Sequence, residues 1–195
     1  MGLFTRTFTH KKWVDAVDRV TAGGDNGFNV RFQALEVDLD AIGAALDSLA
    51  SGVPKDRTIN LAPQLTQSGV DGWVHALGSA SKGAQKGGAY GVMAVALPTT
   101  GTIKKFRVLG SNTGQGSLQL ELFRQELGGA NRVAVAQIAG VHTDPGRTFD
   151  LSIGPATGTE GLDPAYSYFI SARLDGAAPS DAVSITGFQI VCVTG

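Results

Sequence analysis

Large apolar residues recur along residues 28–49 at spacings that alternate between four and three positions. They are Phe28, Phe32, Leu35, Leu39, Ile42, Leu46 and Leu49. This seven-residue repeat is the pattern of a coiled-coil seam, with Phe32, Leu39 and Leu46 at a positions and the other four at d positions. A lone helix of about three heptads is marginally stable in water. The pattern therefore predicts a helix whose apolar stripe packs against partner chains.

The residue types along the seam favour three chains over two. The a positions hold Phe and Leu rather than the Val or Ile that favours two strands. In a parallel bundle, Arg31 at a g position and Glu36 at the next e position are expected to form an ion pair between chains. The alternative is that the stripe packs on the chain's own β domain as an ordinary amphipathic helix. Gly43 costs about 1 kcal/mol relative to Ala, so we expect a short trimeric collar rather than a free-standing rod.

Two further segments flank this helix. Thr9, Trp13, Val17 and Val20 predict a short amphipathic helix over residues 9–20, which ends at the glycine-rich stretch 23–27. The seam helix ends at the Gly and Pro within residues 51–54. From there to residue 88 the apolar residues alternate only loosely, and the stretch 79–88 is small, polar and glycine-rich. The expected organisation is a helical docking and coiled-coil segment (1–52) followed by an extended linker (53–88).

After residue 88 the pattern changes to short apolar-alternating runs separated by turns. Leu118, Leu120 and Leu122 show the alternation most clearly. Seven strands are predicted, over 90–97, 103–109, 117–122, 132–141, 149–153, 166–174 and 182–193. The connections are too short for crossover helices, so the sheets should be antiparallel. We expect a mainly β chain, with an antiparallel, jelly-roll-like β-sandwich over 89–195 and a β-bulge at Gly187, where the apolar phase of the last strand shifts.

Composition narrows the possible functions. The chain has 195 residues, a net charge of −1 and 17% charged residues, so it lacks the basic excess of proteins that bind nucleic acid or anionic lipid non-specifically. No apolar run reaches the roughly 18 residues of a membrane span, and membrane insertion is not expected. Cys192 is the single cysteine and is expected to be a buried, inert thiol.

The sequence also lacks a recognisable catalytic or metal-binding constellation. His10, His75 and His142 lie in three unrelated sequence environments, without a carboxylate or cysteine at ligand spacing. No local signature places a reactive Ser or Cys on a strained turn. We therefore expect a protein that is not an enzyme, with no catalytic residues, no cofactor and no metal.

Aromatic residues offer one binding hypothesis. Trp73, Phe123, Tyr166 and Tyr168 are candidates for stacking on a sugar if they are exposed, together with the loops around Asn112 or Asp163. The alternation around Tyr166 and Tyr168 instead favours packing in a core or between subunits. The sequence leaves both interpretations open.

The chain resembles bacteriophage tail-fibre and related virion proteins. The resemblance of the N-terminal part is carried by Trp13-Val14-Asp15, Val20-Thr21-Ala22, Asn26, Phe28-Asn29-Xaa-Arg31-Phe32 and Leu39-Asp40-Xaa-Ile42. The C-terminal part is similar to small β-sandwich domains of phage fibres through residues 96–103, 118–124, Tyr166-Ser167-Tyr168-Phe169 and Val191-Cys192-Val193-Thr194.

This resemblance implies a virion structural protein that is assembled in the host cytoplasm. Its N-terminal part would dock on the particle and its sandwich would project outward, commonly as a homotrimer. The expected function is a short tail or baseplate-associated fibre or adaptor. The alternatives are a capsid decoration trimer (cement or head fibre) and a glycan-binding module. The expected partners are other copies of the chain, other proteins of the tail, baseplate or capsid, and a host-surface glycan.

Overall fold

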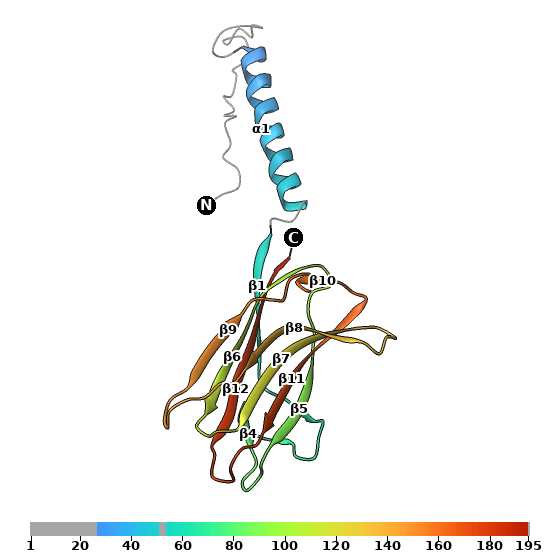
Figure 1. Cartoon of the computed structure of the whole chain (residues 1–195). Helices are drawn as coiled ribbons and strands as arrows, with labels where there is room; N and C mark the ends of the chain where they lie inside the picture. The colour runs from blue at the N-terminus through green and yellow to red at the C-terminus, as the bar shows by residue number, and fades with distance from the viewer. Residues whose placement is uncertain (1–26, 51–53, 195) are drawn as a thin grey trace. The chain divides into compact units, whose positions relative to one another are not determined.

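The computed structural model describes residues 27–50 and 54–194, and the chain divides into two compact units, 1–53 and 54–195. In the first unit, helix α1 spans Phe28–Ala50 (Figure 1). This confirms the helix that the heptad pattern predicts over residues 28–49, and Gly43 lies within it as expected. The helix predicted over residues 9–20 lies outside the described residues.

The second unit is built from strands. They are β1 (Lys55–Leu61), β2 (Thr66–Gln67), β3 (Trp73–Ala76), β4 (Ser79–Lys82), β5 (Ala89–Val95), β6 (Gly101–Asn112), β7 (Ser117–Glu126), β8 (Arg132–Ala139), β9 (Phe149–Ile153), β10 (Gly161–Leu162), β11 (Tyr166–Asp175) and β12 (Val183–Thr194). The seven strands predicted from the sequence correspond to β5, β6, β7, β8, β9, β11 and β12, with ends that differ by a few residues.

Two sheets form the mainly β architecture that the sequence predicts (Figure 1). A five-stranded sheet has the order β2-β5-β11-β7-β8. A seven-stranded sheet has the order β10-β6-β12-β4-β3, with β1 also paired to β12 and β9 to β6. Each described strand pair is antiparallel. In the β12–β6 ladder the register shifts between Ile185 and Gly187, which confirms the bulge predicted at Gly187.

The prediction of an extended linker over residues 53–88 is wrong for most of that range. β1 pairs with β12 along seven consecutive positions, from Lys55 opposite Thr194 to Leu61 opposite Phe188. β3 and β4 form a hairpin, and β4 also pairs with β12. Trp73 and Ala80 are buried in the core. Residues 55–82 are therefore part of the sandwich. The sequence did not predict this because the pairing partner, β12, lies far away in the chain, and local patterns do not reveal such pairing.

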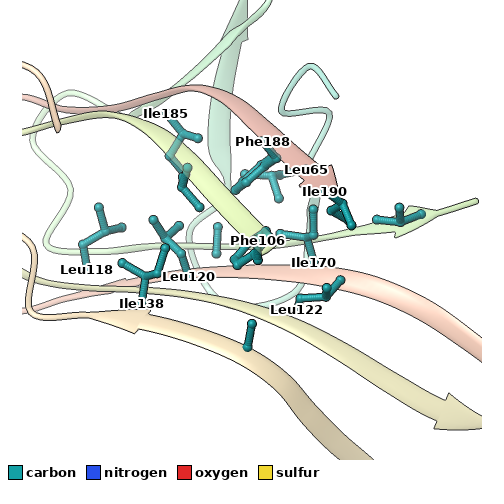
Figure 2. Packing of buried hydrophobic residues seen from close by; sticks show 14 of the residues in the cluster. Leu65, Phe106, Leu118, Leu120, Leu122, Ile138, Ile170, Ile185, Phe188 and Ile190 are labelled. Carbon is teal, nitrogen blue, oxygen red and sulfur yellow. The ribbon is translucent and has the colours of Figure 1, made fainter. Parts of the chain in front are cut away.

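The core lies between the two sheets. Phe106, Ile185, Phe188 and Ile190 project from β6 and β12 toward residues of the other sheet (Figure 2). The core residues of the five-stranded sheet include Leu118, Leu120, Leu122, Ile138 and Ile170. The rings of Phe106 and Phe188 stack with centroids 6.1 Å apart. Alternation of inward apolar and outward polar residues along each strand thus produces one continuous apolar layer.

Candidate functional site

The predicted seam on α1 is exposed in the single chain. The seven heptad residues from Phe28 to Leu49 are between 37% and 63% exposed, with Leu39, Leu46 and Leu49 each at 58%. The rings of Phe28 and Phe32 stack with centroids 5.9 Å apart, so a d residue and the following a residue already form one apolar surface. A row of large apolar side chains on one helical stripe, left in water, is a typical protein–protein contact surface.

The other residues of the predicted collar also lie on α1. Glu36 is exposed and Arg31 is half-buried. The predicted Arg31–Glu36 ion pair would join different chains, so it stays a prediction. Val37 lies at the f position of the same heptads and is 52% exposed. It provides an apolar reference residue on the helix that is off the seam.

A depression of about 300 Å³ lies where the segment after β5 meets the start of β11. Its lining includes Leu97, Pro98, Asp163 and Tyr166. The Arg124 guanidinium lies over the Tyr166 ring, 4.9 Å from the centroid, and donates hydrogen bonds to the carbonyls of the segment 158–159. The tyrosine ring is therefore held in place beside an exposed carboxylate.

Tyr168 forms the floor of this depression. It is 6% exposed, its hydroxyl donates to the Gly161 carbonyl at 3.3 Å, and it accepts from the Asp163 N–H at 3.3 Å. Burial raises the pKa of the Tyr168 hydroxyl above its ordinary value, so the group stays neutral. Asp163 Oδ1 accepts from the Ala165 N–H at 2.8 Å. The structure thus brings together Asp163 and Tyr166, which the sequence named separately.

The remaining aromatic candidates are structural. Trp73 is buried, and its Nε1–H donates to the Ala172 carbonyl at 3.1 Å. Phe123 is 8% exposed and stacks on Phe169 with centroids 5.3 Å apart. Neither offers a free ring face for a sugar, which corrects that hypothesis for these two residues.

The loop around Asn112 is also structural. Asn112 is fully buried, and its Nδ2 donates to the carbonyls of Gly116 and Val141 at 2.9 and 2.7 Å. Its Oδ1 accepts from the Gly114 N–H at 3.3 Å. The amide closes the loop between β6 and β7 and is not available to a ligand. A buried Asn with several bonds to loop carbonyls is a common way to fix a loop.

The histidines and the cysteine have local roles. His75 Nε2 accepts from the Leu65 N–H at 2.9 Å, and His142 Nδ1 lies 2.8 Å from the Gly114 carbonyl. His10 lies outside the described residues. Cys192 is fully buried, as predicted, and burial raises the pKa of its thiol. Over residues 27–50 and 54–194, no three His, Cys, Asp or Glu side chains gather as metal ligands would, and no described helix is long and apolar enough to span a membrane.

Comparison with known proteins shows similarity of fold only. No family model and no curated protein sequence matches the chain. Among solved structures, a xylan-binding module, CBM15, is 13% identical over 72% of this chain and 97% of its own, with a TM-score of 0.44. The CBM36-1 domain of a multidomain xylanase from the hindgut metagenome of Trinervitermes trinervoides is 11% identical over 70% of this chain and 96% of its own, with a TM-score of 0.42.

A structure of infectious bursal disease virus, Gx strain, is 15% identical over 73% of this chain and 32% of its own, with a TM-score of 0.42. At these identities and TM-scores the similarities do not bear on function. The expectation that the chain is not an enzyme rests on the sequence alone.

Proposed function

We propose that this chain is a homotrimeric virion structural protein of a bacteriophage, a short tail or baseplate-associated fibre or adaptor. In this proposal the α1 stripe aligns three chains, the N-terminal part docks on the particle and the β-sandwich projects from it. The observation that carries the proposal is the exposure of all seven heptad residues, between 37% and 63%, in a chain whose sandwich has its own buried core. The resemblance of the sequence to phage fibre proteins supports the virion location.

The physical argument for association is the apolar surface of α1. Burying apolar area contributes about 25 cal/mol per Å², and a helix of this length gains most of its stability from such burial. In a three-stranded bundle the a and d side chains enter holes on the facing helices. Phe32 at an a position suits the wider core of three chains. The sandwich then serves as the exposed part of each subunit.

Size-exclusion chromatography with light scattering tests the assembly. The intact chain is expected to elute with three times its 20.1 kDa mass. Replacing both Leu39 and Leu46 by Asp places charges in the seam and should dissociate the trimer, because a buried unpaired charge is strongly destabilising. A wild-type chain that elutes as a monomer would contradict the proposal.

Imaging of phage particles tests the location. A gold-labelled antibody raised against the chain should bind to the tail or baseplate of the phage particles. Decoration over the capsid would instead support the head-decoration alternative. Particles that carry no label would contradict a virion role.

A second candidate function is glycan binding at the depression beside Tyr166. It is favoured by one observation: a tyrosine ring backed by Arg124 stands beside the exposed Asp163 in a concavity of about 300 Å³. A pyranose presents C–H groups to a ring and hydroxyls to a carboxylate, which is the combination of apolar and oriented polar groups that small-ligand sites use. Loss of glycan-array signal in Tyr166→Ala, with signal kept in Tyr90→Phe, is expected. Wild-type signal at background would exclude this function.

A further inference from the structure

The five-stranded sheet has an outer face whose residues follow from its register. Successive side chains of a strand point to opposite faces of a sheet, and in β11 the residues at even positions from 168 to 174 are buried. The outward residues of β11 are therefore Ser167, Phe169, Ser171 and Arg173. Residues directly opposite in a ladder share a face, which adds Tyr90, Val92 and Ala94 of β5 and Gln119, Glu121 and Phe123 of β7. Together these residues form the β11 track, which combines polar side chains with aromatic rings.

Polar groups in the middle of the β11 track have no partner in the protein. Gln119, Glu121 and Ser171 are each half-buried, and within the described residues their side chains make no hydrogen bond and no ion pair. Polar groups in this position are satisfied by water or by a ligand, because leaving them unpaired is costly. The centre of the track thus offers donors and acceptors that the fold itself does not use.

The outer face of the seven-stranded sheet differs in this respect. Gln189 Nε2 donates to Asn60 Oδ1 at 2.7 Å, and Arg107 Nη1 donates to Gln189 Oε1 at 3.3 Å. Arg107 also forms an ion pair with Asp150. These side chains pair with one another across β1, β12, β6 and the segment at β9. The central polar groups of that face are committed to the fold, whereas those of the β11 track are not.

The β11 track has a hollow at each end. At one end is the depression beside Tyr166, which Ala94 and Ser167 of the track help to line. At the other end, Tyr90 and Asp71 line a second hollow of about 350 Å³ together with glycine backbone. The outward residues of β11 extend over about 20 Å between these ends, at roughly 3.3 Å per residue. The track therefore suits an extended ligand that reaches from one hollow to the other.

The charges along the track favour a ligand without acidic groups. Two ion pairs neutralise charges near the second hollow: Lys86–Asp71 at 2.9 Å and Arg173–Asp175. Among the described residues of the track and its two hollows, the carboxylates without an ion pair are Glu121 and Asp163. A carboxylate accepts hydrogen bonds from hydroxyl groups and repels other anions. The unpaired charge on this surface is thus negative.

We propose that the β11 track binds a linear, neutral oligosaccharide that spans both hollows. This inference rests on the glycan-binding function proposed for the depression beside Tyr166 and names its ligand class. Sugar hydroxyls both donate and accept hydrogen bonds, so they match the carboxylate of Glu121, the amide of Gln119 and the hydroxyl of Ser171.

The aromatic rings of the track match the apolar faces of sugar rings. Tyr166 and Tyr90 stand at the two ends, and Phe169 lies between them, half-buried. Aromatic walls with a few placed polar groups are typical of small-ligand sites. An extended peptide fits less well, because peptides of this kind pair with the main chain at a sheet edge, and the track lies on a face.

A glycan array probed with the full-length chain tests the length and charge of the ligand. The probes are linear oligomers of glucose, N-acetylglucosamine, galactose or mannose with one to six units, and the same chains with a terminal glucuronic or sialic acid. For the sugar that is bound, the signal should rise at least about tenfold between one and six units, because each added contact multiplies the affinity. A terminal acid should lower the signal.

Two variants locate the binding on the track. Ser171→Leu places a bulky side chain in the middle of the track and should lower the six-unit signal at least about tenfold, while the one-unit signal of the depression is kept. Glu121→Ala removes an unpaired acceptor and should act in the same direction, because hydrogen bonds to charged groups are the stronger ones. Ser152→Leu, at an exposed position opposite Arg107 on the other outer face, is the matched control and should keep both signals.

The possible outcomes separate this inference from the glycan function itself. Equal signals for one and six units, or a stronger signal for acid-capped chains, would overturn the β11 track and leave binding at the depression in place. Equal losses in Ser171→Leu and Ser152→Leu would also overturn the track. A wild-type chain with no signal on any probe would exclude the glycan function together with this inference.

Discussion

The substitution Leu39→Ala distinguishes between two interpretations of the α1 stripe: a seam that is buried in a trimer, and a surface that stays exposed to solvent. In the single chain Leu39 is 58% exposed, so a monomer loses little packing when the side chain is shortened. In the proposed trimer the same side chain enters a hole between facing helices. The size of the effect therefore reports directly on burial.

The expected magnitude follows from the three-fold repetition of the site. A Leu→Ala change at a buried site costs about 2 kcal/mol at the low end of the measured range. Each trimer contains three such sites, so the association free energy should fall by about 6 kcal/mol. Since about 1.4 kcal/mol corresponds to a factor of ten, the trimer dissociation constant should rise by about four orders of magnitude. Partial repacking of the phenylalanines nearby would reduce this value.

Sedimentation equilibrium over a range of chain concentrations measures this dissociation. Val37→Ala is the matched control, because Val37 lies off the seam on the same helix and is 52% exposed. Its effect should stay within about 0.5 kcal/mol, as for ordinary surface substitutions. Equal shifts in Leu39→Ala and Val37→Ala would refute the assignment of the seam.

Three further predictions concern the sandwich. Phe106→Ala removes a fully buried ring that stacks on Phe188 and should lower the free energy of unfolding by about 3–5 kcal/mol in a denaturant titration; a loss below about 1 kcal/mol would contradict this packing. Lys82→Met removes an ammonium that donates to the carbonyls of residues 86 and 179 and should cost about 1–3 kcal/mol because the acceptors are left unpaired; an unchanged denaturation midpoint would contradict it. Hydrogen bonds from the Tyr90 hydroxyl and from the Arg173 guanidinium hold the pKa of Asp175 below its ordinary value. The ionised carboxylate therefore stabilises the folded chain above the unfolded pKa of about 3.9, and this stabilisation is lost as the pH falls through the folded pKa. Asp175→Asn should therefore lower the melting temperature near neutral pH and lose this effect in acid, and a constant difference across the pH range would contradict the linkage.

The parts of the fold that could be predicted from the sequence are those with strong local periodicity. The heptad repeat predicts α1, because spacings of three and four place residues on one helical stripe. Leu118, Leu120 and Leu122 predict a half-buried strand by their period of two, and the register shift near Gly187 follows from the change of phase. These features depend on neighbours in sequence and need no knowledge of distant partners.

The missed strands depend on distant partners. β1 begins with three charged residues and pairs with a strand more than a hundred residues away, so its sequence alone indicates a solvated linker. Trp73 belongs to the core only because the β3–β4 hairpin joins the same sheet. Pairing between elements far apart in sequence is set by tertiary packing, which local patterns do not contain.

The candidate sites show the same division. The alternating residues Leu151 and Ile153 predict a strand facing a core, and only the structure shows that their side chains remain 37% and 43% exposed. Tyr166 and Tyr168 belong to the same alternating run and line the same depression, yet Tyr166 is half-buried and Tyr168 is buried. Exposure, which decides between a binding surface and a core, follows from the arrangement of strands.

Native mass spectrometry of the intact chain at micromolar concentration tests the central claim most directly. The claim is that the exposed stripe of α1 is a seam between three copies. The predicted result is a dominant species of three chain masses. A dominant species at the single-chain mass of 20.1 kDa would contradict it.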